Sequence, residues 1–439
     1  MKDNVPLLQI NKLAIPAVLA GIIEPLIGIV DTAFVGKSPS YPVESLAAIG
    51  LATTFYFFIF WVFVQLETAL SSIVAKYLGQ NREDELAPLI TQALLLNILI
   101  GSALFLITNF FIENIMSWYN AEGKVLELAI KYYNIRSIGF PIALSTYTLW
   151  GVFRGLQNTW WAMLIGIIGG LINMVLDYYF IFGIGGKLTP MGVEGAALGS
   201  VIAQTIMFML SLILFQKFTP YKIKFQKSIH PELKSMLTIS GAFMIRTISL
   251  NLVLFKANAV ATKFGEPQMA AHTIAMQIWM FVSFMLDGYA NAGLALSGKL
   301  LAENRIIALK KLTKTLIIIG ILISLVAVQF MVFWYSEIGR MFSENTEVLT
   351  IFYSIFIFVI ISQPINAIAF TYDGILKGMA AAKFIRNLMV FAAISFFITL
   401  EILVYNFQLD ITAVWISLIF WMIIRAVIPS FYLRNRLVT

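Results

Sequence analysis

The chain has 439 residues, of which 60% are hydrophobic and only 12% are charged, with a mean hydropathy of +0.87 and a formal net charge of +7. Soluble domains carry about 45–50% apolar and about 25% charged residues, so a globule of this size would leave much apolar surface in water. The composition predicts an integral membrane protein. The absence of cysteine excludes disulfides and thiolate chemistry, and two histidines are too few for a histidine-built metal centre.

Apolar runs long enough to cross a bilayer recur along the whole chain. They are continuous rather than alternating every second residue, which favours helices over a barrel of strands. The first run is too long for the apolar core of a signal peptide and is expected to stay in the protein as a span. Twelve spans are expected, at 10–36, 46–74, 87–111, 125–152, 160–183, 192–216, 235–263, 268–296, 312–334, 347–375, 385–406 and 411–433.

The distribution of Lys and Arg predicts the orientation. The segments on the side of the N-terminus carry most of these residues, whereas the opposite loops carry few. Because positively charged loops stay in the cytoplasm, both termini are expected there, with the protein in a bacterial inner (plasma) membrane. This bias accounts for most of the positive net charge, so no nucleic-acid partner is expected.

An internal repeat divides the chain near its middle. At an offset of 223 residues, Lys76, Asn81 and Arg82 coincide with Lys299, Asn304 and Arg305, and further Pro and Gly positions coincide beyond them. Two six-helix bundles related by pseudo-symmetry are therefore expected, as in other two-lobed transporters. The predicted domains are an N-terminal lobe at 1–216, a cytoplasmic linker at 217–234 and a C-terminal lobe at 235–439. A cleft within one chain needs no second subunit, so a monomer is expected.

Several motifs together resemble one known family. They are EPLIGIVDTAFVG (24–36), AKYLGQNRED (75–84), FRGLQNT (153–159), NMVLD (173–177), MAAHTIAMQIWMF (269–281) and DGILKG (373–378). Their order and spacing are similar to those of the multidrug and toxic compound extrusion (MATE) family, particularly its DinF-like branch. The resemblance covers nearly the whole chain. It implies two six-helix bundles around a central cavity, and export of organic, often cationic, compounds against inflow of protons or sodium.

Ionisable residues inside membrane spans are costly and indicate functional sites. In the first span, Asp31 lies two helical turns after Glu24, and Pro16 and Pro25 interrupt the backbone hydrogen bonds of the same helix. In the family, the acid of this helix couples transport to the ion and a nearby proline is the bending point. The resemblance gives these roles to Asp31 and Pro16. Glu24 is expected to help Asp31 in ion coupling, and Pro25 is expected to be a second point at which the helix can bend. The structural alternative for Asp31 is a carboxylate that caps the helix end.

Asn173 and Asp177 are four residues apart and share one helix face. An amide beside a carboxylate could hold a proton network or a small cation, and the family's N-lobe cation site is similar. Apart from sodium at Asp31, Asn173 and Asp177, no metal ion is expected to bind. The alternative is a hydrogen-bonded pair that fixes helix packing.

The second half supplies a further set of candidates for a substrate cavity. They are Asp287, Asp373, Arg246, Met276 and Met280, since methionines accommodate varied flat cations and the charges lie within spans. Sodium-coupled members of the family place a Glu in the seventh span, where this chain has Asn251. That substitution argues against a sodium site in this half. Arg246 is expected to neutralise Asp287 or Asp373, or else to serve anionic substrates.

The sequence therefore predicts a secondary active antiporter that exports multiple drugs or organic cations, coupled to inward movement of protons or sodium. The expected partners are cationic, amphiphilic small molecules, the coupling ion and lipid, with no cofactor. A lipid-linked saccharide flippase of the same superfamily is the alternative, and a passive channel is a further one. No catalytic constellation is present, and the P-loop-like GLALSGKL (293–300) ends in Leu300 rather than Ser or Thr, so no enzyme is expected. The GxxxG pairs Gly151/Gly155, Gly166/Gly170, Gly195/Gly199 and Gly374/Gly378 predict faces of close helix packing.

Overall fold

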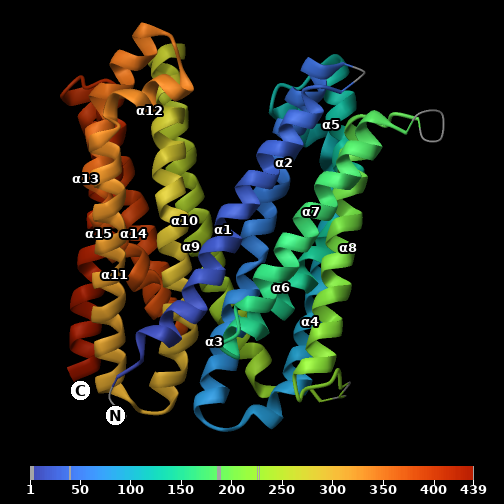
Figure 1. Cartoon of the computed structure of the whole chain (residues 1–439), viewed down its shortest axis with the longest axis vertical. Helices are drawn as coiled ribbons and strands as arrows, with labels where there is room; N and C mark the ends of the chain where they lie inside the picture. Colours follow the sequence, from blue (N-terminus) through green and yellow to red (C-terminus); the bar gives the residue numbers. More distant parts are fainter. Residues whose placement is uncertain (1–3, 39–40, 185–188, 225, 227, 439) are drawn as a thin grey trace. The chain divides into compact units, whose positions relative to one another are not determined.

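The computed structural model describes residues 4–38, 41–184, 189–224, 226 and 228–438, and the side chains at 23–26, 29 and 437–438 are not described. The described residues form helices and no β-strand (Figure 1). Contacts divide the chain into two compact units. We call residues 19–238 the N unit and residues 1–18 with 239–439 the C unit. The boundaries predicted for the two lobes and the linker stay a prediction.

The described residues of the first half form eight α-helices and a short 3-10 helix. The first, α1, supplies residues 7–18 to the C unit and residues 19–35 to the N unit. The elements are α1 (Leu7–Val35), α2 (Pro42–Phe63), α3 (Gln65–Gly79), η1 (Glu83–Glu85), α4 (Leu86–Trp118), α5 (Gly123–Arg136), α6 (Gly139–Gly155), α7 (Trp160–Phe182) and α8 (Val193–Phe218).

The second half repeats this arrangement. Its elements are α9 (Pro231–Lys263), α10 (Glu266–Ala302), α11 (Ile306–Phe333), α12 (Tyr335–Phe342), α13 (Thr346–Gly378), α14 (Ala382–Glu401), the π-helical turn η2 (Ile402–Asn406) and α15 (Ile411–Val438). The offset of 223 residues carries α5 and α6 together onto α13, with the same first and last positions. In the N unit this span is broken after Arg136, whereas α13 continues through Pro364.

The repeat is visible in the backbone itself. Asn81 and Asn304, which are related by the offset, adopt φ values of 52° and 56°. Gln157 and Ala380, related in the same way, adopt 61° and 53°. Left-handed conformations are uncommon outside glycine, so two matched pairs are not a product of shared hydrophobicity. The expected pseudo-symmetry of the two bundles is confirmed.

The described helices account for the expected spans. Ten of them are long and apolar enough to cross a membrane, counting α2 with α3, η1 with α4, and α14 with η2. The other two expected spans correspond to α1, of which Leu7–Ile22 is a shorter apolar helix, and to the broken pair α5 and α6. The expected all-α membrane fold is confirmed.

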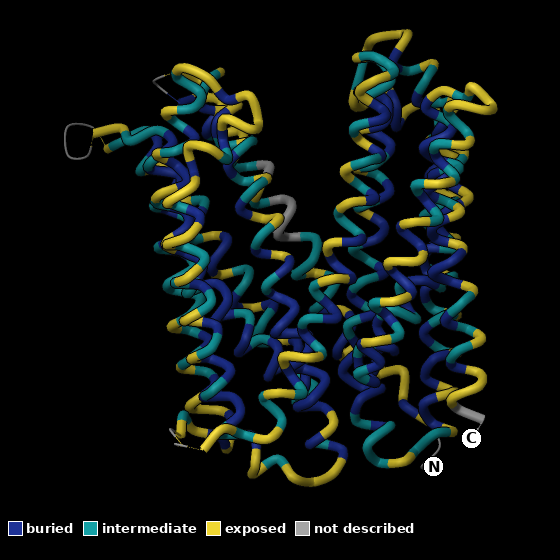
Figure 2. The backbone as a smooth tube through the Cα atoms, turned by 180° about the vertical axis from the view of Figure 1, so that it is seen from behind, coloured by how far each residue is buried: buried dark blue, intermediate teal, exposed yellow. Residues whose placement is uncertain are grey.

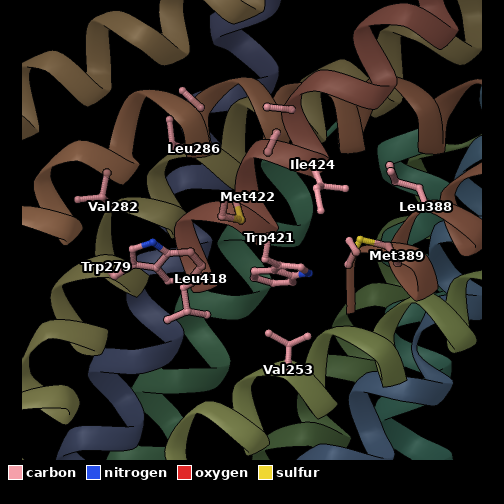
Figure 3. Close-up of a cluster of buried hydrophobic side chains, with 14 of the residues drawn as sticks. Val253, Trp279, Val282, Leu286, Leu388, Met389, Leu418, Trp421, Met422 and Ile424 are labelled. Atoms are coloured by element: carbon pink, nitrogen blue, oxygen red, sulfur yellow. The ribbon is translucent and has the colours of Figure 1, made fainter. Parts of the chain in front are cut away.

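Each unit has its own apolar core. Figure 2 shows buried positions on the inward faces of the helices and exposed positions on their outer faces, as helices in a bilayer require. In the N unit, the rings of Tyr56 and Phe140 stack with centroids 4.5 Å apart. In the C unit, Trp279, Trp421 and Met422 belong to a continuous buried cluster (Figure 3).

Glycines set the closest helix approaches in both units. A Cβ on Gly374 of α13 would meet the main chain of Ala290 in α10, and one on Gly151 of α6 would meet the main chain of Glu67 in α3. Gly151 and Gly374 are related by the repeat, as are their two partners. Small residues at these crossings let the backbones touch, which is how helices gain packing energy in lipid.

Candidate functional site: a buried carboxyl pair in the N unit

Two acidic side chains meet inside the N unit. Asp31 is partly buried near the end of α1, and Asp177 is buried in α7. Their carboxyl groups lie within hydrogen-bonding reach of each other. Asn173, one helical turn before Asp177, donates from Nδ2 to Asp177 Oδ1 at 3.0 Å. The structure thus brings together Asp31, Asn173 and Asp177, which are three of the four residues that the sequence analysis proposed for ion coupling.

A glycine in the neighbouring helix makes room for this pair. Gly199 of α8 packs against Asp177, and a Cβ at that position would occupy the place of Asp177 Oδ1. The carboxylate therefore lies directly against the backbone of α8. Any larger residue at 199 would force the Asp177 side chain to move.

A buried guanidinium faces the two acids. Arg136, in the last turn of α5, interacts electrostatically with both Asp31 and Asp177. Its Nη1 donates to Gln204 Oε1 of α8 at 3.0 Å, and its Cζ lies 4.1 Å from the centroid of the Tyr56 ring of α2. These contacts hold the cation in place beside the carboxyl pair. The sequence analysis gave no role to Arg136 and missed Gln204.

The charges of this site do not balance. Arg136 can offset one of the two carboxylates, and among the described residues no other cation is paired with Asp31 or Asp177. Asp31 Oδ1 and Asp177 Oδ2 are buried, and neither accepts a hydrogen bond from a donor group in the described part of the chain. A buried carboxylate without compensation is costly, so the site should take up one positive charge, either a proton or a small cation bound by oxygen.

The other residues proposed in the first helix are placed only in part. Pro16 is buried in α1 and lies two residues before Val18, the last residue that α1 supplies to the C unit. Glu24 and Pro25 fall among the residues whose side chains are not described. The coupling role of Glu24 and the bending roles of both prolines stay predictions.

The acids proposed for the C unit are engaged with other polar groups. Arg246 of α9 binds Asp373 of α13 through Nη2 and Nε, at 2.6 and 3.3 Å. Asp287 accepts a hydrogen bond from Asn291 at 3.1 Å. The ion pair matches one of the two partners expected for Arg246.

The remaining C-unit candidates lie close to the apolar core. Met276 and Met280 pack, partly buried, against the core of the C unit. Asn251 donates to the carbonyl of Thr247 in its own helix. Within the described ranges, no group of three or more His, Asp or Glu is placed to hold a metal ion. The substrate-cavity assignment of these C-unit residues stays a prediction.

A duplicated bundle of membrane-crossing helices with ionisable groups buried among them defines a polytopic membrane transporter. The family model described as MatE matches residues 16–179 and 242–403, which is well over half of the chain. The chain belongs to the MATE family, so it is a transporter of the multidrug and toxic compound efflux type and not an enzyme.

Curated relatives and solved structures agree with this assignment. The chain is 27% identical to Protein DETOXIFICATION 44, chloroplastic, of Arabidopsis thaliana, over 98% of this chain and 82% of the relative. It is 24% identical to DNA damage-inducible protein F of Escherichia coli, over 94% and 89%. It is 25% identical to Multidrug resistance protein NorM of Photobacterium profundum, over 87% and 84%.

The fold matches crystal structures along nearly its whole length. A MATE protein solved in complex with MaD3S has a TM-score of 0.89 at 22% identity, covering 98% of this chain and 96% of that one. A MATE protein solved in the bent conformation has a TM-score of 0.90 at 22% identity, covering 98% and 95%. At this identity the structures establish the fold, and the family model establishes the family.

Proposed function

We propose that this chain exports organic cations in exchange for protons that move inward, and that the Asp31–Asp177 pair carries the proton. The supporting observation is the contact between these two carboxyl groups, each with a buried oxygen that meets no donor among the described residues. Two acids in contact cannot both be charged at low cost, so they share a proton readily. Protonation and release at this pair would follow the gradient.

The position of the pair suggests how protonation would change the conformation of α1. Asp31 lies in α1, which carries Pro16 near the residue where the helix passes from one unit to the other. When the pair gains a proton, its attraction for a cationic substrate falls and α1 is free to change its bend at a proline. MATE proteins have been solved in a bent conformation and in a straight conformation. The substrate would then leave on the outside.

Sodium is the competing coupling ion. Asn173 and the two carboxylates offer oxygen ligands of the kind that hard cations use. Arg136, however, already supplies one positive charge beside the pair. The remaining single negative charge suits a proton, which needs no coordination shell. Because the family is established, the saccharide flippase is no longer favoured.

The coupling ion can be tested in proteoliposomes that contain the purified chain and an external fluorescent cation, ethidium. An acidic lumen should drive ethidium inward, and a one-unit pH difference supports up to about tenfold accumulation for a one-to-one exchange. A sodium gradient of the same size, without a pH difference, should drive none. Accumulation driven by sodium alone would contradict proton coupling.

The residues can be tested in the same assay. Asp31→Asn and Asp177→Asn should each abolish gradient-driven accumulation. In either variant the remaining carboxyl group has no second acid with which to share a proton. Asp84→Asn is the matched control, since Asp84 is an exposed acid in η1 and changes the charge equally. If Asp31→Asn accumulates ethidium as the unaltered chain does, Asp31 is not the coupling residue.

We further propose that the protein lies in a bacterial inner membrane with both termini on the cytoplasmic side. We also propose that the chain acts as a monomer. The charge distribution of the loops supports the orientation. The lack of native cysteine makes it testable, because a single introduced cysteine is the only label site. Lys234→Cys should be protected from an impermeant maleimide in intact cells, whereas Glu122→Cys should react. The opposite result would invert the topology.

A further inference from the structure

The C unit contains a cluster of buried charges that the transport proposal does not use. Asp373 of α13 is bound by Arg246 from α9, at 2.6 Å, and by Lys377 from its own helix, at 2.7 Å. Arg425 of α15 is 97% buried, with 3% of its surface exposed, and interacts electrostatically with Asp373. Asp287 of α10 interacts electrostatically with Lys377.

This cluster carries an excess positive charge. Three cations, Arg246, Lys377 and Arg425, face two anions, Asp373 and Asp287. The two short ion pairs leave Arg425 as the cation without a carboxylate within 4.0 Å in the described part of the chain. An unpaired guanidinium is unfavourable in a protein interior surrounded by lipid. The positive charge of Arg425 is therefore not neutralised by a carboxylate of the described residues, and binding of an anion would neutralise it.

The Arg425 side chain has a free donor. Its Nη1 contacts only the weak acceptor Met422 Sδ, at 3.2 Å, and its Nη2 is buried with no hydrogen-bond partner among the described residues. The guanidinium carbon lies 4.5 Å from the centroid of the Trp421 ring. Figure 3 shows Trp421 and Met422 with Leu388 and Met389 in the same apolar region. Buried donors of this kind are normally satisfied.

A small cavity is lined in part by the Arg425 side chain. It is lined by Ala369, Asp373, Leu376, Ile385, Leu388, Met389, Arg425 and Pro429. The volume of the cavity that is open to the centre of a water-sized sphere is about 10 Å³. This is room for one small occupant. The walls are apolar apart from Arg425 and Asp373, and Asp373 is already engaged by two cations. A molecular anion such as a carboxylate is too large for this space.

We propose that this cavity is a binding site for one small inorganic anion of the size of chloride, held by Nη2 of Arg425. A water molecule could accept the hydrogen bond, but only an anion also offsets the excess charge. The 223-residue repeat places Trp150 of α6 opposite Asp373 of α13. The N unit therefore has no acid at the position of Asp373, so the charge cluster is not repeated there.

The test is the thermal stability of the detergent-purified full chain in sodium chloride and in sodium gluconate at equal ionic strength. Gluconate is too large for the cavity. Chloride that binds only the folded chain should raise Tm by roughly 2–4 °C and in a saturable manner, whereas gluconate should not. Equal Tm values in the two salts would overturn the proposal.

Two variants assign the effect to the cavity. Arg425→Gln should lose the difference between the two salts, because the unpaired charge is gone. Arg434→Gln should keep it, since Arg434 is exposed on the same helix and removes the same charge. A chloride effect that persists in Arg425→Gln, or that disappears in Arg434→Gln, would place the anion elsewhere.

A second measurement does not depend on a variant that must fold. Crystals of the unaltered chain grown in sodium bromide should show an anomalous peak within hydrogen-bonding distance of Arg425 Nη2. Bromide peaks elsewhere with none at Arg425 would overturn the site. Neither experiment involves transport, so its outcome is independent of whether Asp31 and Asp177 carry protons.

Discussion

Replacing Gly374 by alanine tests whether α10 and α13 are held together by direct backbone contact. The three atoms nearest to the added Cβ all belong to the main chain of Ala290, and all lie closer than real Cβ atoms approach their neighbours. A main chain cannot turn aside as a side chain can, so the two helices must separate. Gly241→Ala in α9 is the matched control, because an added Cβ there meets no atom of the described residues within 4 Å.

The two substitutions should change stability in opposite directions. Overpacking costs up to about 3 kcal/mol and alanine regains about 1 kcal/mol of helix propensity, so Gly374→Ala should destabilise the C unit by up to about 2 kcal/mol. Gly241→Ala gains the propensity without the clash and should stabilise by up to about 1 kcal/mol.

The assay is the intrinsic tryptophan fluorescence of the purified protein during heating. For a unit of this length, Gly374→Ala should lower Tm by about 4–8 °C and Gly241→Ala should raise it by up to about 4 °C. Both must be compared at one scan rate, because unfolding of a membrane protein in detergent is commonly irreversible. A Gly374→Ala protein that melts at or above the temperature of the unaltered chain would refute the packing argument.

Further predictions concern the N unit. Gly151→Ala should lower Tm to a similar extent, because its Cβ would meet the main chain of Glu67 as Gly374 meets its repeat-related partner. Arg154→Met should destabilise by about 3 kcal/mol, since it removes the cation 2.7 Å from the buried Glu67 carboxylate, and adding Glu67→Gln should recover most of the loss in a double-mutant cycle of thermal unfolding. Gly199→Ala should abolish pH-driven ethidium accumulation without removing an acid, because it displaces Asp177; normal accumulation would show that the carboxyl need not lie against α8.

Much of the fold could be predicted because its causes are local in the sequence. Apolar runs of membrane length define spans whatever their neighbours, and the offset between Lys76 and Lys299 reveals the duplication. The GxxxG pairs correctly marked three of the close-packed crossings. Gly166 is different. A Cβ added there would lie 3.7 Å from the ring of Trp150, which is an ordinary van der Waals contact. A spacing pattern shows which glycines share a face but not what that face meets.

The candidate site could be predicted only within single helices. Helical periodicity placed Asn173 and Asp177 on one face, and the hydrogen bond between them follows from it. That Asp31 would meet Asp177, and that Arg136 would face both, depends on how α1, α5 and α7 pack. Periodicity within a helix carries no information on its rotation against another helix.

The sequence by itself determined that the protein lies in lipid, that it is helical, that it is duplicated and which residues can carry charge. These properties depend on composition, on short spacings and on the repeat. Only the tertiary structure decided which charges are paired. Asp373 is bound by Arg246 and Lys377, whereas Arg425 retains a buried nitrogen that has no partner among the residues the structure describes. Pairing is a matter of a few ångströms between distant segments. In the low dielectric of a protein within a bilayer, those few ångströms decide whether a charge is neutralised or remains free to bind an ion.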